Sequence, residues 1–407
     1  MSGKDYLQIW YRAQAAIALF CVCVIAGWEV VHGLPYIRMF AVMGLILVLA
    51  LVAEAVRLPR WLELSNRWLQ CLAQPVIMVV VWAIMSREII VRLQLPARGV
   101  MIMTMAYFVV MFAPLAGIVG GELKNVVARI FYPFWWFAIL TSLLGAIYPE
   151  KFAGPQFFVL LIGTGALGAL AFFLMAVAAM RSWELSWPGI KPQFGRGFSW
   201  WSFCFLMVVA LVFIALNALG GITSWSDLVA TLGPHNLLSN HEYLLSAFEA
   251  GVAEETLCRF VILGALLVAF RNLAQQLPLA VVASALLFAL MHLGNMLAQP
   301  VSTTLLQVLG TFGLGLFFAV VYLYTGQLWL AMLLHFLLDW TAFAASGSTT
   351  MNTVPTTSEW IAVGVEVVVF IGITVWMLTG DRRLVVDRHA RRLTGADQHF
   401  GYRLSFD

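Results

Sequence analysis

Four ionisable residues interrupt an apolar stretch of the sequence at residues 249–260, EAGVAEETLCRF. They are Glu249, Glu254, Glu255 and Arg259, and the residues directly after them are uncharged. An ionised side chain in hydrocarbon is costly unless it pairs or meets water, so such residues mark functional sites in membrane proteins. This stretch is therefore the first candidate for chemistry.

Two later apolar runs also carry ionisable residues, namely His292 in FALMHLGN and His335 with Asp339 in LLHFLLDW. His335 and Asp339 are four residues apart and share a helix face, so Asp339 is able to orient the imidazole or receive its proton. Counted along the expected helices, Glu254 and these three residues lie at a similar depth near the middle of the bilayer. We expect all four to converge in one polar pocket.

The neighbouring carboxylates in EETLCR have different expected partners. Glu255 and Arg259 are four residues apart on one helix face, which predicts an intrahelical ion pair. Glu254 is turned by about 100° from Glu255 and is free to point elsewhere. The pairing predicts that Glu255 is neutralised, whereas Glu254 is left to react.

A carboxylate that faces two histidines in a cavity with little bulk solvent suits hydrolysis by activated water. Glu254 would take a proton from water, while the histidines and the amide of Asn295, one turn beyond His292, would donate to an oxyanion. No serine or cysteine is evidently paired with a base, and we interpret Cys258 as packing. The same Glu and His residues are also possible metal ligands, but no HExxH motif is present, so we expect no metal and no cofactor.

The composition indicates which elements position these residues. The chain has 407 residues, of which 62% are hydrophobic and 11% charged, whereas a soluble domain has about 25% charged residues. Such a chain cannot cover a water-facing surface, so it is a polytopic membrane protein in contact with the lipid bilayer. The five cysteines form no CxxC pair, and the net charge of +3 reflects loop placement. We therefore expect no disulfide framework, no zinc knuckle and no nucleic-acid partner.

Apolar runs long enough to cross about 30 Å of hydrocarbon recur along the whole chain. They predict an all-α transmembrane bundle of about twelve helices, beginning near residues 14, 39, 68, 99, 130, 156, 200, 244, 279, 302, 326 and 359. If both termini are cytoplasmic, Lys and Arg residues are concentrated on the inner side. We therefore expect cytoplasmic termini and, from the short loops, the inner (plasma) membrane of a bacterium.

The polar break at residues 181–200 is the best candidate boundary between two helical blocks. It divides the chain into an N-terminal transmembrane block of unknown role at 1–199 and a core at 200–380 that carries the site. Residues 381–407 form a basic cytoplasmic tail, which we interpret as an anchor to anionic lipid. The N-terminal helices are a possible surface for a membrane partner.

Three motifs in order resemble the CPBP family of intramembrane proteases, which contains CaaX proteases and bacteriocin-processing (Abi) enzymes. The family pattern EExxxR, FxxxH and HxxxN or HxxxD is matched by EETLCR at 254–259, FALMH at 288–292 and HFLLD at 335–339. The resemblance covers roughly residues 240–350. Three motifs in this order, at compatible depth, are more specific than any one of them.

The resemblance implies a catalytic set and a supporting set of residues. The catalytic set is Glu254, His292, His335 and Asp339. The supporting set is Glu255, Arg259 and Phe288; Asn295 joins it because its amide lies one turn beyond His292. Glu254 would be the general base, and the two histidines with Asp339 would form the side that stabilises the oxyanion and handles protons. Phe288 would pack within its motif.

The resemblance also implies a reaction class without a metal. Eukaryotic members of the family remove the last three residues of prenylated CaaX proteins, and bacterial members process peptides or have no known substrate. Asp339 stands where the prenyl-protein enzymes have Asn, and the family tolerates both. We therefore expect a glutamate-dependent intramembrane endopeptidase that acts on a membrane-anchored protein or peptide.

Three other interpretations of the polar cluster stay open. It could be a structural network that holds three helices together, although an extra carboxylate and two histidines make that costly. It could relay protons in a proton-coupled transporter, although such proteins carry paired repeats and the charged residues here gather in one half. The chain could also be a non-proteolytic scaffold or regulator of the same family.

Overall fold

A computed structural model of the chain describes residues 3–33, 36–147, 156–185, 187, 189–190, 194, 197–219, 224–233, 237 and 240–395. Parts of two expected features lie outside these residues, namely the polar break at 181–200 and the end of the tail at 381–407. The described residues contain helices and no strands. They form two compact units, the first ending at Trp183 and the second beginning at Glu184.

Helices that could cross a membrane make up most of the described chain. By length and composition there are ten of them, or up to eleven if Gln156–Gly163 and Ala166–Ser182, which meet at 53°, form one bent span. The helical run from His241 to Ala269 occupies the remaining expected position, near residue 244, but carries the charges of EETLCR. The predicted all-α polytopic bundle is confirmed, because each expected apolar run corresponds to a helical segment.

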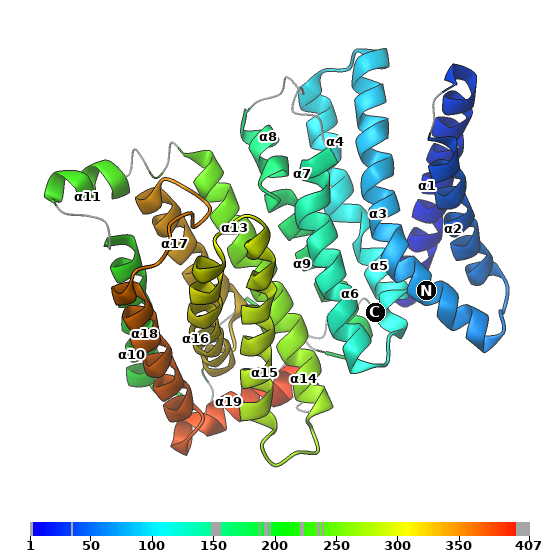
Figure 1. Cartoon of the computed structure of the whole chain (residues 1–407). Coiled ribbons are helices and arrows are strands. Elements are labelled where there is room, and N and C mark those ends of the chain that lie inside the picture. Colours follow the sequence, from blue (N-terminus) through cyan, green and yellow to red (C-terminus); the bar gives the residue numbers. More distant parts are fainter. Residues whose placement is uncertain are drawn as a thin grey trace. The chain divides into compact units, whose positions relative to one another are not determined.

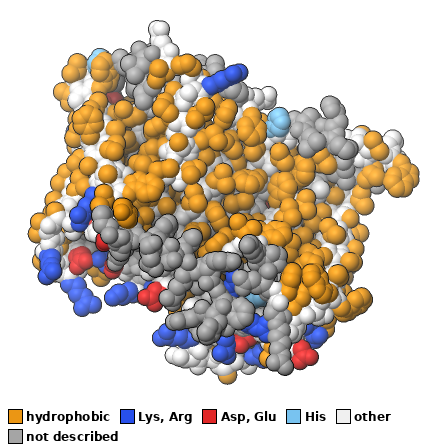
Figure 2. Space-filling model, turned by 180° about the vertical axis from the view of Figure 1, so that it is seen from behind, with side chains coloured by type: hydrophobic (Ala, Val, Ile, Leu, Met, Phe, Trp, Pro, Cys, Tyr) orange, Lys and Arg blue, Asp and Glu red, His pale blue; other side chains and the backbone are white. Residues whose placement is uncertain are grey.

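Large apolar side chains cover the outside of these helices. Phe20 is 69% exposed, Leu216 is 65% exposed and Val368 is 68% exposed. Figure 2 shows hydrophobic side chains over most of the visible helical surface. A surface of this kind suits hydrocarbon and is unsuited to water, which agrees with an integral membrane protein.

The first unit is a bundle of helices in which two short irregular segments interrupt the α-helical pattern. Its elements are α1 (Gly3–His32), α2 (Ile37–Ala55), α3 (Arg60–Leu93), α4 (Ala97–Met111), α5 (Ala113–Ile118), η1 (Gly120–Glu122), α6 (Val126–Ala138), the π-helical η2 (Ile139–Leu143), α7 (Leu144–Ile147), α8 (Gln156–Gly163) and α9 (Ala166–Ser182).

A proline inside α3 explains one of the contacts in this unit. Pro75 has no amide hydrogen, so the carbonyl of Cys71, four residues earlier, loses its intrahelical donor. The indole of Trp136 in α6 donates to that carbonyl at 2.9 Å, and the indole of Trp135 donates to the carbonyl of Leu72 at 2.8 Å. Because hydrocarbon supplies no water, a neighbouring helix has to satisfy the freed group.

The second unit contains all of the expected site residues. Its elements are α10 (Trp200–Leu219), α11 (Trp225–Leu232), α13 (His241–Glu255), the π-helical η3 (Thr256–Ile262), α14 (Leu263–Ala269), α15 (Gln276–Met291), the 3₁₀-helical η4 (His292–Leu297), α16 (Val301–Thr325), α17 (Leu328–Ser346), α18 (Thr357–Met377) and α19 (Gly380–Leu393). Within this unit α13 packs on α17, and α16 packs on both α15 and α18 (Figure 1).

A glycine sets how closely α13 approaches α17. A side chain at Gly251 would place its Cβ 2.8 Å from the carbonyl oxygen of Met332 and 2.9 Å from the amide nitrogen of Phe336, both in α17. Real Cβ atoms do not come that close to backbone. Gly251 therefore allows the two backbones to touch, and this brings the glutamates at the end of α13 against the histidine of α17.

The start of the expected basic tail is a packed helix, α19, which crosses the ends of α14, α16 and α18 (Figure 1). Val385, Val386 and Ala390 are buried on one side of it. The ring nitrogen Nδ1 of His389 donates to the carbonyl of Leu323 at 2.7 Å. This bond satisfies one of the unpaired carbonyls at the end of α16, so α19 is part of the folded unit.

Candidate active site

The two glutamates lie where α13 changes to the π-helical segment η3. Glu254 and Glu255 are the last residues of α13, and Arg259 lies within η3. A π-helix leaves some carbonyls without their usual partner, and π-helical turns often occur at functional sites. The hydroxyl of Ser284 in α15 donates to the carbonyl of Cys258 at 2.8 Å and so supports this irregular turn.

Glu255 contacts both Arg259 and His335 in the interior of the site. Its Oε2 lies 3.2 Å from Nε of Arg259, and its Oε1 lies 2.9 Å from Nδ1 of His335. The side chains of Glu255 and Arg259 are fully buried, and that of His335 is 8% exposed. The predicted Glu255–Arg259 pair is confirmed. The contact with His335 was not predicted, because spacing along one helix does not reveal contacts between helices.

Arg259 is held largely by aromatic rings. Its guanidinium carbon lies 4.3 Å from the ring centroid of Phe288 and 5.9 Å from that of Phe318. Its two terminal nitrogens have no hydrogen-bond partner among the described residues. The ring faces and the Glu255 carboxylate therefore stabilise this charge together. Phe288 does more than pack, because it covers the cation that neutralises Glu255.

His335 faces carboxylates through both ring nitrogens. Nδ1 meets Glu255, while Nε2 lies 3.4 Å from Oδ2 of Asp339 and 3.9 Å from Oε2 of Glu254. Ionised carboxylates only accept hydrogen bonds, so both nitrogens are able to donate only in the imidazolium form. Phe318 stacks on the ring at a centroid distance of 5.6 Å. The predicted proximity of His335 and Asp339 is confirmed.

His292 has a defined tautomer. Its Nδ1 lies 3.0 Å from the backbone carbonyl of Phe288, and a carbonyl only accepts, so Nδ1 carries the hydrogen. In the neutral ring Nε2 is then an acceptor. His292 lies close enough to Glu254 for an electrostatic interaction. The oxyanion-donor role expected for His292 would need the protonated ring, whereas the neutral ring suits a water ligand.

The Asn295 amide is directed to a residue that the motifs did not identify. Its Nδ2 donates to Oε1 of Gln307 in α16 at 2.9 Å. The motifs also miss two site residues on α16, Gln307 and Phe318. Gln307 left a signal in the sequence, since it is the one side-chain amide in the apolar run 301–325. Phe318 left none, because aromatic residues are common throughout this chain.

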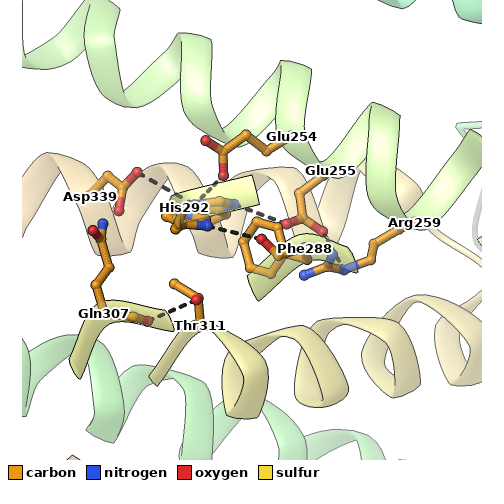
Figure 3. Close-up of polar contacts among 9 residues, drawn as sticks. Glu254, Glu255, Arg259, Phe288, His292, Gln307, Thr311 and Asp339 are labelled. Carbon is orange, nitrogen blue, oxygen red and sulfur yellow. Dashed lines mark hydrogen bonds and ion pairs between the residues drawn. The ribbon is translucent and has the colours of Figure 1, made fainter. Parts of the chain in front are cut away.

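The site has a buried side and an accessible side. The Glu254 side chain is 17% exposed and that of Asp339 is 23% exposed, whereas Glu255 and Arg259 are fully buried. Figure 3 shows Glu254 pointing into the site from α13, while Glu255 turns toward Arg259. Glu249, five residues earlier in α13, interacts electrostatically with Glu254 and Asp339. The accessible side is therefore rich in carboxylates.

The described residues contain no group of three or more His, Cys, Asp or Glu side chains arranged to hold a metal ion. Both ring nitrogens of His335 instead face carboxylate oxygens, and Nδ1 of His292 donates to a backbone carbonyl. Such an arrangement serves proton transfer and hydrogen bonding directly.

Comparison with known proteins identifies one related family. Residues 236–341 match the family model described as Type II CAAX prenyl endopeptidase Rce1-like. The resemblance predicted from the three motifs is confirmed over this segment, which contains every residue of the site. The matched family is a family of membrane proteases. No curated protein and no solved structure matches the chain.

Proposed function

We propose that this chain is an intramembrane endopeptidase in which Glu254 activates water to hydrolyse a peptide bond of a membrane-associated protein or peptide. The difference between the two adjacent glutamates carries the proposal. Glu255 is fully buried and engaged by Arg259 and His335. Glu254 is partly exposed, and its nearest described cation is Nε2 of His335 at 3.9 Å, beyond hydrogen-bond distance. One carboxylate is structural, and the other is available for reaction.

The proposed reaction begins with water held between Glu254 and His292. Glu254 accepts one proton from the water, and the neutral Nε2 of His292 accepts a hydrogen bond from the other hydrogen. The water oxygen forms a bond to the peptide carbonyl carbon, and the carbonyl electron pair moves onto oxygen. The C–N bond then breaks, and the proton on Glu254 passes to the leaving nitrogen.

His335 stabilises the oxyanion in this scheme. Its Nε2–H points to the accessible side, where Glu254 and Asp339 lie. The imidazolium form places a positive donor where negative charge develops, and it acts in a region that excludes most water. Glu255 keeps the ring in this orientation through Nδ1. Asp339 balances the charge of the imidazolium before the substrate arrives.

The substrate class follows from the site and from the matched family. A site among membrane helices receives substrates that are themselves in or at the membrane. The matched family is named for prenylated CAAX proteins, so a prenylated CAAX C-terminus is the first substrate to test. The first unit, through residue 183, would provide a surface for substrates or partners, and the core from residue 200 onward would carry the chemistry. We place the protein in a bacterial inner membrane with both termini in the cytoplasm.

The test compares peptide termini of the membrane fraction in cells that express equal amounts of wild type or Glu254→Gln. Termini that appear with the wild type and not with the variant support proteolysis and identify the cleavage site. Glu366→Gln in α18 is the matched control, because it makes the same change in a membrane helix outside the site. The proposal fails if wild type and Glu254→Gln give the same termini while purified wild type leaves prenylated CAAX peptides intact. That result would favour a scaffold or a proton-coupled transporter.

A further inference from the structure

Gln307 extends the polar contacts of the site onto α16. Its side-chain oxygen Oε1 accepts a hydrogen bond of 2.9 Å from Nδ2 of Asn295 in η4. Its backbone carbonyl accepts a hydrogen bond from Thr311 at 2.8 Å, as is common within a helix. Asn295 therefore fixes the rotation of the Gln307 amide, and the Nε2 end is directed away from Asn295.

The Nε2 end of Gln307 is turned toward a carboxylate. Figure 3 shows the amide of Gln307 reaching from α16 toward the carboxylate of Asp339. A carboxylate only accepts hydrogen bonds, so an N–H in this direction is favourable. A flipped amide would place its oxygen against the carboxylate oxygens and would also break the bond from Asn295. Both neighbours thus select the same orientation.

Asp339 in turn contacts the histidine of the site. Its Oδ2 lies 3.4 Å from Nε2 of His335, which is longer than a typical charged hydrogen bond of about 2.8 Å. The Asp339 side chain is 23% exposed, so solvent and a substrate both compete for it. A carboxylate in this situation needs a second partner to stay at the imidazole. Among the described residues, Gln307 is oriented to be that partner.

We propose that Gln307 is a positioning residue that holds the Asp339 carboxylate at Nε2 of His335, with Asn295 locking its amide. The inference rests on the proposed function. It adds that a residue of α16 sets the position of the groups that stabilise the oxyanion. The proposed Gln307–Asp339 contact links the Asn295–Gln307 bond to the contacts among Asp339, His335, Glu255 and Arg259, and the linked residues come from five elements. Asn295 then acts on the oxyanion site indirectly, through Gln307 and Asp339, and does not itself donate a hydrogen bond to the oxyanion.

The first experiment observes His335 without requiring activity. The histidine rings of the purified full-length protein are labelled with ¹⁵N, and the His335 signals are assigned from their loss in His335→Gln. Gln307→Leu should move the Nε2 signal of His335 in the same direction as Asp339→Asn. Thr311→Val is the matched control on α16, because its hydroxyl bonds only to carbonyls of its own helix among the described residues. It should leave the signal in place.

A second variant covers the case in which the leucine variant does not fold. Gln307→Glu keeps the size of the side chain but turns an N–H donor into a group that repels Asp339 when ionised. It should also move the His335 signal, and by more than Thr311→Val does. A His335 signal that stays at the wild-type position in every folded Gln307 variant overturns the proposal.

The second experiment measures cleavage of whichever substrate the terminus comparison identifies. Gln307→Leu should lower kcat by about 10- to 100-fold, as expected for a misplaced catalytic group, with little change in KM. In an Asp339→Asn background the same change should add almost nothing, because Gln307 acts through Asp339. Independent effects of the two changes, or an effect on KM alone, would mean that Gln307 contacts substrate and would overturn the proposal. If wild type and Glu254→Gln cleave equally, the peptidase proposal fails, while the His335 signal still decides the role of Gln307.

Discussion

Nδ1 of His335 lies 2.9 Å from Oε1 of Glu255, across the contact between α17 and α13. This bond joins the second glutamate of EETLCR to the histidine of HFLLD, so two motifs far apart in the sequence share one hydrogen bond. It also divides the work of the two glutamates. Glu255 contacts both the histidine and Arg259, whereas Glu254 is partly exposed and is the glutamate that we propose to activate water.

The first prediction separates the two glutamates by stability. Glu255→Gln leaves the buried Arg259 without its counter-charge, so we expect a loss of about 3–5 kcal/mol in the free energy of unfolding. Glu254→Gln removes no buried partner and should change stability by less than about 1 kcal/mol, while it lowers kcat by about 10²–10⁴-fold. Denaturant unfolding in mild detergent and cleavage of the identified substrate measure the two effects. Equal losses of stability in both variants would contradict the division of roles.

This division shows what the sequence reveals and what it does not. Membrane helices follow from apolar runs because every backbone polar group in hydrocarbon has to be satisfied within its own segment. The Glu255–Arg259 pair follows from spacing along one helix. The Glu255–His335 bond and the Gln307 amide depend on how helices pack, and that packing is set by close contacts such as the one at Gly251. Residue types and spacing alone do not contain this information.

The C-terminal segment illustrates the same limit. Its many arginines predict an anchor at the membrane surface, and nothing in its low hydropathy predicts a packed helix. In the structure Val385 and Val386 are buried, and His389 closes the end of α16. The buried apolar residues and the ring nitrogen of His389 dock the helix, and a count of charges does not reveal them.

A second prediction concerns the close approach of α13 and α17. Gly251→Ala should push α17 away, because the added Cβ would meet the backbone at Met332 and Phe336. We expect a loss of about 1–3 kcal/mol in stability, together with reduced cleavage, since the Glu255–His335 bond would lengthen. Gly372→Ala in α18 is the matched control, because nothing lies within 4 Å of its added Cβ. Full activity of Gly251→Ala would show that the helix contact does not set the site geometry.

A third prediction tests the support of the π-helical turn. Ser284→Ala removes the hydroxyl that donates to the carbonyl of Cys258 and leaves this buried acceptor unsatisfied. The expected cost is about 1–3 kcal/mol, and cleavage should fall as well, because the turn sets the relative positions of Glu254 and Arg259. Ser284→Cys keeps a weak donor of similar size and should recover part of both losses. Identical behaviour of the two variants would argue against the hydrogen bond as the cause.

A fourth prediction concerns the first unit and is independent of catalysis. Trp136→Phe removes the indole donor from the Cys71 carbonyl that Pro75 leaves free. We expect a loss of about 1–3 kcal/mol in the free energy of unfolding, with no change in the cleavage step. In a Pro75→Ala background the restored amide of residue 75 can donate to Cys71 within α3, so Trp136→Phe should then cost clearly less. The double-mutant cycle, followed by thermal unfolding in detergent, measures this coupling. Only the hydrogen-bond part of the cost depends on whether residue 75 has an amide hydrogen. Equal costs of Trp136→Phe in both backgrounds would therefore show that the indole contributes by packing alone.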